Sequence, residues 1–177
     1  MLTYIKTFSI AVLGAKLADQ EPQSPAPPQR FPIVGIGASA GGFEALRRLL
    51  EAMPNDPGVA LVIIQHLARD KPSLVPELLA RYTRMEVRQV TDEPTVQPGH
   101  VYVIPPGKFL SISSGKLRLT EMEGPRRAPV SIDFFFRALA KDQRECAVGV
   151  ILSGTGSDGV LGVKAIKEAG GLVLVQD

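Results

Sequence analysis

The feature that most limits how this chain can fold is the alternation of short apolar runs with segments of helical periodicity from residue 31 onward. Continuous apolar runs are typical of strands buried on both faces, and apolar residues three and four apart are typical of helices. Because such strands and helices are joined by right-handed crossovers, we expect an α/β fold with a doubly wound, mostly parallel sheet in a Rossmann-like three-layer arrangement. The pattern predicts strands over residues 33–36, 59–64, 86–90, 101–104, 147–152 and 172–175, and helices over residues 43–52, 72–84, 132–142 and 160–169, the third of these beginning through a capping Ser131.

Two further runs depart from this alternation. Residues 109–113 and 116–120 alternate apolar and polar side chains and flank Ser114-Gly115. A two-residue connection that ends in glycine is typical of a hairpin. We therefore expect a β-hairpin attached to the main fold as an antiparallel appendage.

Residues 1–30 differ from the rest of the chain. Residues 1–18 are mildly apolar and residues 21–28 are rich in proline, so we expect an N-terminal tail and a Pro-rich linker ahead of one domain at residues 31–177. A signal peptide fits less well, because the apolar core is short and Lys16 interrupts the cleavage region. No apolar run approaches the roughly 20 residues that span a bilayer, so no membrane insertion is expected.

Composition narrows the partners and the compartment. The single Cys146 cannot form an internal disulfide, and no Cys/His cluster has zinc-binding spacing, so we expect a cytoplasmic protein without a metal. A net charge of +2 is too small to favour nucleic acid as a partner.

Residues 33–50 combine a strand, a glycine-rich turn and a helix start around Ser39. The unpaired N–H groups of a helix start suit either a nucleophile or a bound anion. Residues 35–40 fit the dinucleotide-binding fingerprint with alanine in last place, and residues 37–41 fit the nucleophile-elbow pattern. A nicotinamide site usually has an acidic residue after the second strand, where this chain has Gln65-His66. A dinucleotide-binding domain is therefore the weaker alternative.

Three polar residues, Ser39, His66 and Asp158, follow the carboxyl ends of strongly apolar strands. In a doubly wound sheet, ligands and reacting groups lie outside that edge. A serine, an imidazole and a carboxylate can act together there as nucleophile, base and orienting acid. The other histidine, His100, precedes its strand, so we expect it at the opposite edge with a structural role. The chain order serine, histidine, acid is not that of the common α/β-hydrolases.

Each of these residues also has a structural interpretation. Ser39 could cap the helix, His66 could be a polar residue at the sheet rim, and Asp158 could belong to a turn. Their coincidence at one edge leaves the catalytic and structural interpretations evenly matched on the residues alone.

Several ordered motifs resemble the catalytic domain of the CheB-type chemotaxis protein-glutamate methylesterases. The resemblance runs from about Ile33 to the last residue. The matching segments are Gly35-Ile36-Gly37-Ala38-Ser39-Ala40-Gly41-Gly42, Gln65-His66, residues 98–105, Ser131-Ile132-Asp133, residues 149–159 and Ala169-Gly170-Gly171.

The resemblance implies a serine esterase that hydrolyses γ-glutamyl methyl esters on the cytoplasmic helices of methyl-accepting chemoreceptors, and that also deamidates receptor glutamines in many members. It implies Ser39 as nucleophile, His66 as general base and Asp158 as orienting acid. By analogy, backbone N–H groups near Ala40, Gly41 or Thr155 would stabilise the oxyanion. No metal or organic cofactor is implied.

Three departures from the family pattern bear on this interpretation. Residues 1–30 are too few for the receiver domain that family members usually carry upstream. Gly154-Thr155-Gly156 resembles the variety found in proteins that fuse this domain to a receptor methyltransferase domain. The family domain also continues through another helix and strand beyond residue 177, so we expect a C-terminally truncated domain. An inactive, truncated receptor-binding module is therefore a second alternative.

Overall fold

The computed structural model describes residues 31–66, 73–91, 93–122, 130–152 and 157–176. Its main sheet has six strands in the order β3-β4-β2-β1-β7-β8, and every neighbouring pair is parallel. The prediction of a doubly wound parallel sheet is confirmed. The strands are β1 (Ile33–Ala38), β2 (Ala60–Gln65), β3 (Glu86–Gln89), β4 (His100–Val103), β7 (Ala147–Ile151) and β8 (Leu172–Val175).

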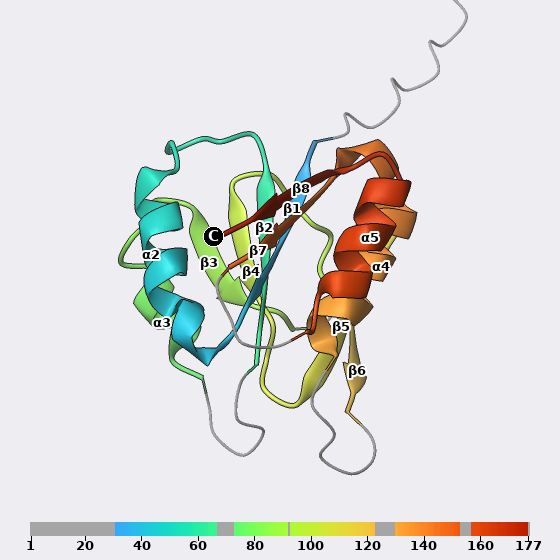
Figure 1. Cartoon of the computed structure of the whole chain (residues 1–177). Coiled ribbons are helices and arrows are strands. Elements are labelled where there is room, and N and C mark those ends of the chain that lie inside the picture. The colour runs from blue at the N-terminus through green and yellow to red at the C-terminus, as the bar shows by residue number, and fades with distance from the viewer. Residues whose placement is uncertain (1–30, 67–72, 92, 123–129, 153–156, 177) are drawn as a thin grey trace, which may run out of the picture. The chain divides into compact units, whose positions relative to one another are not determined.

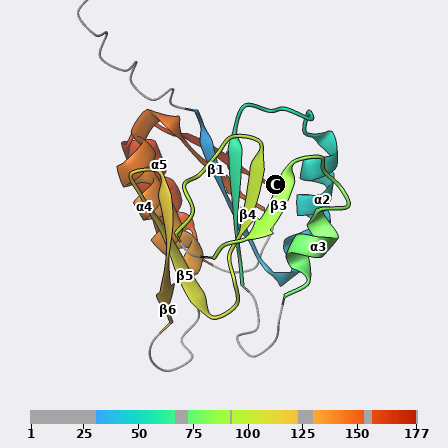
Figure 2. The same cartoon turned by 180° about the vertical axis from the view of Figure 1, so that it is seen from behind.

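Helices cover both faces of this sheet (Figures 1 and 2). α2 (Phe43–Ala52) and α3 (Val75–Leu79) lie on one face, and α4 (Ser131–Gln143) and α5 (Val160–Glu168) lie on the other. Each face has its own apolar core, one around Leu46 and Leu50 of α2 and one around Phe135 and Phe136 of α4. The central strand β1 pairs in parallel with β2 and β7 between these two cores. No helix in the described part of the chain is long and apolar enough to cross a membrane.

The helix predicted over residues 72–84 is shorter in the structure, where α3 covers Val75–Leu79 and residue 72 lies outside the described part. After Leu79 the backbone tightens, because the N–H groups of Arg81 and Tyr82 bond three residues back rather than four. The hydroxyl of Thr83 then accepts the N–H of Met85 at 3.1 Å. This side chain competes with the helical pattern and turns the chain into β3.

The predicted hairpin is present as β5 (Lys108–Ser113) and β6 (Lys116–Glu121), which pair antiparallel. Ser114 and Gly115 both have positive φ, 52° and 69°, as a tight two-residue hairpin turn requires. Asp142 of α4 accepts both of their N–H groups, at 2.5 and 3.1 Å. The hairpin is therefore tied to the carboxyl end of α4.

The first turn of α4 packs directly on the backbone of β1. A Cβ atom at Gly37 would lie 2.6 Å from Cγ2 of Ile132, which is too close for any side chain. Gly37, like Gly35, lies inside β1 rather than in the turn that follows it. These glycines therefore allow helix–sheet contact, whereas the glycines of a dinucleotide fingerprint belong to the turn and helix start that hold the phosphates.

Candidate active site

Ser39 and His66 follow two paired strands at the same edge of the sheet. β1 and β2 pair with Ala38 opposite Gln65. Ser39 is the residue directly after Ala38, and His66 is the residue directly after Gln65. Ser39 is extended, with φ −77° and ψ 174°, and its carbonyl accepts the N–H of Gly42 at 2.9 Å. This bond closes a single 3₁₀ turn, η1 (Ala40–Gly42), which leads into α2. Ser39 therefore stands at the start of a helical segment, as the sequence predicts.

Gln65 connects the ends of these two strands. Its side chain is buried, and its Nε2 donates a long hydrogen bond of 3.4 Å to the carbonyl of Ser39. Its Oε1 has no hydrogen-bond partner among the residues that the structure describes. The residue before the histidine thus contacts the backbone of the candidate nucleophile, a role that the sequence does not reveal.

The structure brings His66 and Asp158 into direct contact. Nε2 of His66 lies 2.8 Å from Oδ2 of Asp158, although the residues are 92 positions apart. The His66 side chain is 32% exposed and that of Asp158 is 8% exposed, so the imidazole is reachable and the carboxylate is enclosed. With the neutral imidazole donating from Nε2, Nδ1 is the nitrogen that can accept a proton.

Asp158 also caps helix α4. Its Oδ2 accepts the N–H of Ile132 at 3.0 Å, and its Oδ1 accepts the N–H of Asp133 at 2.9 Å. The expectation that Ser131 caps this helix is wrong: Ser131 lies inside the first turn, and its buried Oγ has no hydrogen-bond partner in the described part of the chain. A carboxylate satisfies two N–H groups at once and complements the helix dipole, which a hydroxyl does less well.

These contacts determine the ionisation of Asp158. Burial of the carboxyl is the largest single influence on its pKa and acts to raise it. The hydrogen bonds from His66 and from the N–H groups of Asp133 and Ile132 act together in the opposite direction, and the pKa is lowered overall. Asp158 is therefore held as an anion beside the imidazole.

The other residues considered from the sequence lie as follows. Ala40 and Gly41 are the first two residues of η1, and a Cβ atom at Gly41 would have no atom of the described residues within 4 Å. Thr155 lies outside the described residues. His100 begins β4, at the opposite edge from His66, where its Nδ1 donates to the carbonyl of Pro98 at 2.9 Å. Among the residues that the structure describes, no group of three or more His, Cys, Asp or Glu could hold a metal ion.

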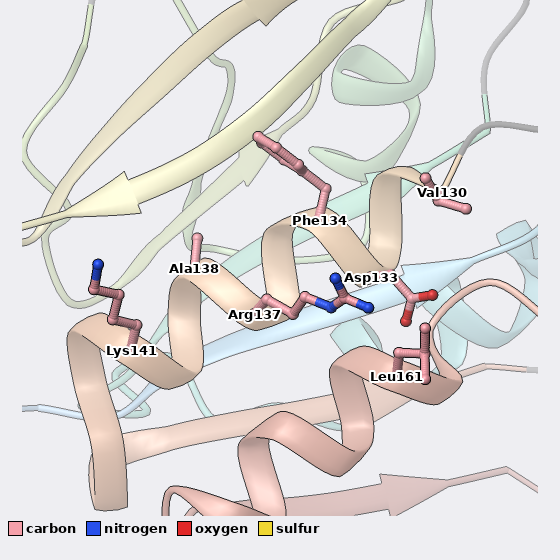
Figure 3. Close-up of a pocket in the computed structure, with 7 residues that line it drawn as sticks. All are labelled: Val130, Asp133, Phe134, Arg137, Ala138, Lys141 and Leu161. Carbon is pink, nitrogen blue, oxygen red and sulfur yellow. The ribbon is translucent and has the colours of Figure 1, made fainter.

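A groove of about 470 Å³ runs along α4 and is lined by that helix, by Val130 before it and by Leu161 of α5 (Figure 3). Val130, Phe134 and Leu161 give it exposed apolar side chains, and Arg137 and Lys141 lie farther along α4. Asp133 also lines the groove. Asp133 thus borders the groove, and its N–H is bonded to Asp158.

Comparisons with known proteins bear on the family and the fold of the chain. The family model for the CheB methylesterases matches residues 34–177. In fold, the chain is similar to the crystal structure of the Thermotoga maritima CheB methylesterase catalytic domain, with a TM-score of 0.73, 28% identity, and coverage of 81% of this chain and 78% of that one.

The similar curated proteins have matching names. A protein-glutamate methylesterase/protein-glutamine glutaminase of Xanthomonas oryzae is 42% identical over 149 residues, which cover 82% of this chain and 41% of that relative. One from Burkholderia lata is 39% identical over 94% of this chain and 50% of its own length. A putative one from Leptospira interrogans is 32% identical over 83% of this chain and 77% of its own. The chain thus spans only about two fifths to one half of the first two relatives, but the match covers nearly all of the described domain. The chain belongs to the CheB methylesterase family.

Proposed function

We propose that this protein is a carboxylic ester hydrolase that removes methyl groups from glutamate γ-methyl esters of chemoreceptors, with Ser39 as nucleophile, His66 as general base and Asp158 as orienting acid. One observation carries the proposal: His66 contacts the anionic Asp158 at the sheet edge where Ser39 follows the neighbouring strand. The names of the relatives, protein-glutamate methylesterase, support the choice of substrate.

The chemistry follows from these positions. The Ser39 hydroxyl attacks the ester carbonyl while Nδ1 of His66 takes its proton, and the tetrahedral intermediate collapses as the imidazolium returns that proton to the departing methoxy group. Methanol leaves and a glutamyl ester of Ser39 remains. A water molecule then attacks this ester by the same route, releasing the glutamate carboxyl and restoring Ser39. Asp158 keeps the ring in one tautomer and stabilises the imidazolium in both steps.

The oxyanion of each intermediate needs donors close to Ser39. The N–H groups of Ala40 and Gly41 lie at the start of η1, where helical N–H groups have no partner within the helix. We assign the oxyanion to these two groups. Thr155 is kept as a further donor on the family resemblance alone.

Deamidation of receptor glutamines is a second candidate function. The curated relatives are also named protein-glutamine glutaminases. The same attack on a side-chain amide would release ammonia in place of methanol, so the two activities share all three residues.

The proposal also covers the domain bounds, the substrate, the compartment and a partner of the enzyme. We assign the catalytic domain to residues 31–177 and a tail and linker to residues 1–30. The substrate would be the cytoplasmic helices of methyl-accepting receptors, and the enzyme would work in the cytoplasm. A receptor methyltransferase domain is a further proposed partner.

Methanol release from a methyl-labelled receptor tests the proposal. Wild type should release volatile label, and Ser39→Ala should reduce the rate by about 10,000-fold or more while remaining folded. Ser113→Ala, at an exposed position in the hairpin, is the matched control and should leave the rate unchanged. An unchanged rate in Ser39→Ala overturns the assignment. Receptor binding without methanol release supports the inactive binding module, and an NADH fluorescence titration that saturates supports the dinucleotide alternative.

A further inference from the structure

We infer that Asp133 is a positioning residue for the reaction: it fixes the orienting acid Asp158 by tying the first turn of α4 to the first turn of α5. The inference rests on the proposed function of Asp158. Asp133 has no direct side-chain role in the proposed chemistry.

The two aspartates cap each other's helices. Asp158, two residues before α5 begins, accepts N–H groups from Ile132 and Asp133 in the first turn of α4. Asp133 in turn accepts the N–H of Gly162, in the first turn of α5, at 2.6 Å through its Oδ1. Figure 3 shows the Asp133 carboxylate directed toward the start of α5. Asp158 therefore complements the N-terminus of α4, and Asp133 complements that of α5.

The backbones of the two helices meet at the same point. A Cβ atom at Gly162 would lie 2.5 Å from Cβ of Phe136 and 3.2 Å from Cα of Asp133. This contact lets the N–H of Gly162 reach the Asp133 carboxylate. Because α5 starts two residues after Asp158, a change in how α5 meets α4 moves the carboxylate that holds His66.

Burial makes this link strong. Asp133 is 7% exposed, so its carboxylate has little access to water and depends on the protein for hydrogen bonds. The alternative is that Asp133 stabilises the helix pair without affecting the reaction. If Asp133 positions Asp158, its removal lowers kcat even in a fully folded protein. If it only stabilises the helix pair, its removal lowers the stability and leaves the kcat of the folded protein unchanged.

The chain offers a matched control for stability. Asp142, on the same helix, also accepts two backbone N–H groups, from Ser114 and Gly115 in the hairpin turn. Within the described part of the chain, the Asp142 carboxylate bonds to Ser114, Gly115 and Gln143, and not to Asp158 or α5. Asp142→Ala should therefore lower the melting temperature without lowering kcat.

Steady-state hydrolysis of the methylated receptor by the full chain tests the inference, at a temperature where each variant is folded. Asp133→Ala should lower kcat by about 10- to 100-fold with KM nearly unchanged, because a small displacement of the acid misorients the imidazole. Asp133→Asn keeps an oxygen for the N–H of Gly162 and should recover most of kcat. The downfield proton resonance of the His66–Asp158 hydrogen bond should broaden in Asp133→Ala and persist in Asp133→Asn and Asp142→Ala.

The outcomes separate this inference from the proposed function. If wild type releases no methanol, or Ser39→Ala releases it normally, the proposed function has failed. If those two behave as expected but Asp133→Ala keeps the kcat of Asp142→Ala, the positioning role is overturned. Equal losses in Asp133→Asn and Asp133→Ala also overturn it, since charge would then matter and the hydrogen bond would not. Should Asp133→Ala fail to fold, Asp133→Ser, with a shorter acceptor, is measured in its place against the same criteria.

Discussion

Two helical segments begin beside the candidate active site, and they treat their N-terminal N–H groups in opposite ways. At α4, two of these groups bond to the buried Asp158 carboxylate. At η1 and α2, neither Ser39 nor Gly42 provides a side-chain cap. The one acidic residue in the first turn of α2, Glu44, points its carboxylate to Arg47 and Arg48 instead.

The difference separates a permanent anion from a transient one. The N–H groups of α4 hold a charge that must stay in place throughout the reaction to stabilise the imidazolium. The N–H groups at η1 stand next to Ser39, where negative charge develops only in the tetrahedral intermediates of the proposed reaction. A side chain capping η1 would compete with that oxyanion, so a start at which neither Ser39 nor Gly42 supplies a side-chain cap suits the proposed role.

Removing the permanent anion should have the largest effect. Asp158→Ala takes away the partner of His66 and the cap of α4 together. We expect kcat for methanol release to fall about 10,000-fold, since loss of the orienting acid has that effect in other serine triads. We also expect the free energy of unfolding to fall by about 1–3 kcal/mol, from the lost cap and the two N–H groups left without a partner. Initial rates and urea unfolding measure the two quantities.

Two variants separate these effects. Ser39→Ala should lose activity without the loss of stability, and Asp142→Ala should lose stability without the loss of activity. If Asp158→Ala unfolds at the same urea concentration as wild type, Asp158 does not hold the start of α4.

The sequence predicts well where Ser39 and His66 lie. Ser39 and His66 lie where the apolar runs stop, and in a parallel sheet strand ends at one edge come together whatever the details of packing. The same rule predicts that Asp158 lies at this edge. These positions depend only on the order of strands and helices, which alternating hydrophobicity reveals.

The hydrogen bonds at the starts of α4 and α5 could not be predicted from the sequence. Ser131 has the residue type of an N-cap, yet the cap is Asp158, which lies 26 residues beyond Ile132, because the folded sheet brings this carboxylate to the first N–H groups of the helix. The link from Asp133 to Gly162 spans 29 residues and likewise depends on tertiary packing. The fingerprint pattern places Gly37 in a ligand-binding loop, whereas the close approach of Ile132 shows that it makes room for α4.

A proline at residue 40 tests the start of η1, and its expected effect on kcat is smaller than that of Asp158→Ala. Ala40→Pro deletes one N–H at the first position of η1, where proline is tolerated, and Ser39 already has the extended ψ of 174° that a residue before proline prefers. If this N–H binds the oxyanion, kcat should fall about 100- to 1,000-fold with the melting temperature nearly unchanged. Steady-state rates measure kcat, and thermal unfolding measures the melting temperature.

Ala40→Gly is the matched variant, because it changes the side chain and keeps the N–H. It should lose far less activity than Ala40→Pro. Full activity in a folded Ala40→Pro protein would leave Gly41 and Thr155 as the remaining donors.

Acid pH should give the smallest effect and distinguish the two helix starts by burial. The pKa of Asp158 is lowered in the folded state from its ordinary value of 3.8, so its contribution to stability is complete above that value and is lost as the pH falls through the folded-state pKa. In urea unfolding between about pH 5 and about pH 3, wild type should therefore lose more stability than Asp158→Asn.

The pKa of Glu44 is also lowered, to about 2, chiefly by its hydrogen bond to Arg47, but this carboxylate is exposed. Because salt screens exposed charges far more than buried ones, about 0.5 M NaCl should abolish the pH-dependent difference between wild type and Glu44→Gln and leave that of Asp158→Asn in place. Equal salt sensitivity of the two differences would mean that the Asp158 carboxylate is as accessible to solvent as Glu44, and that α4 begins without the enclosed anion on which the comparison depends.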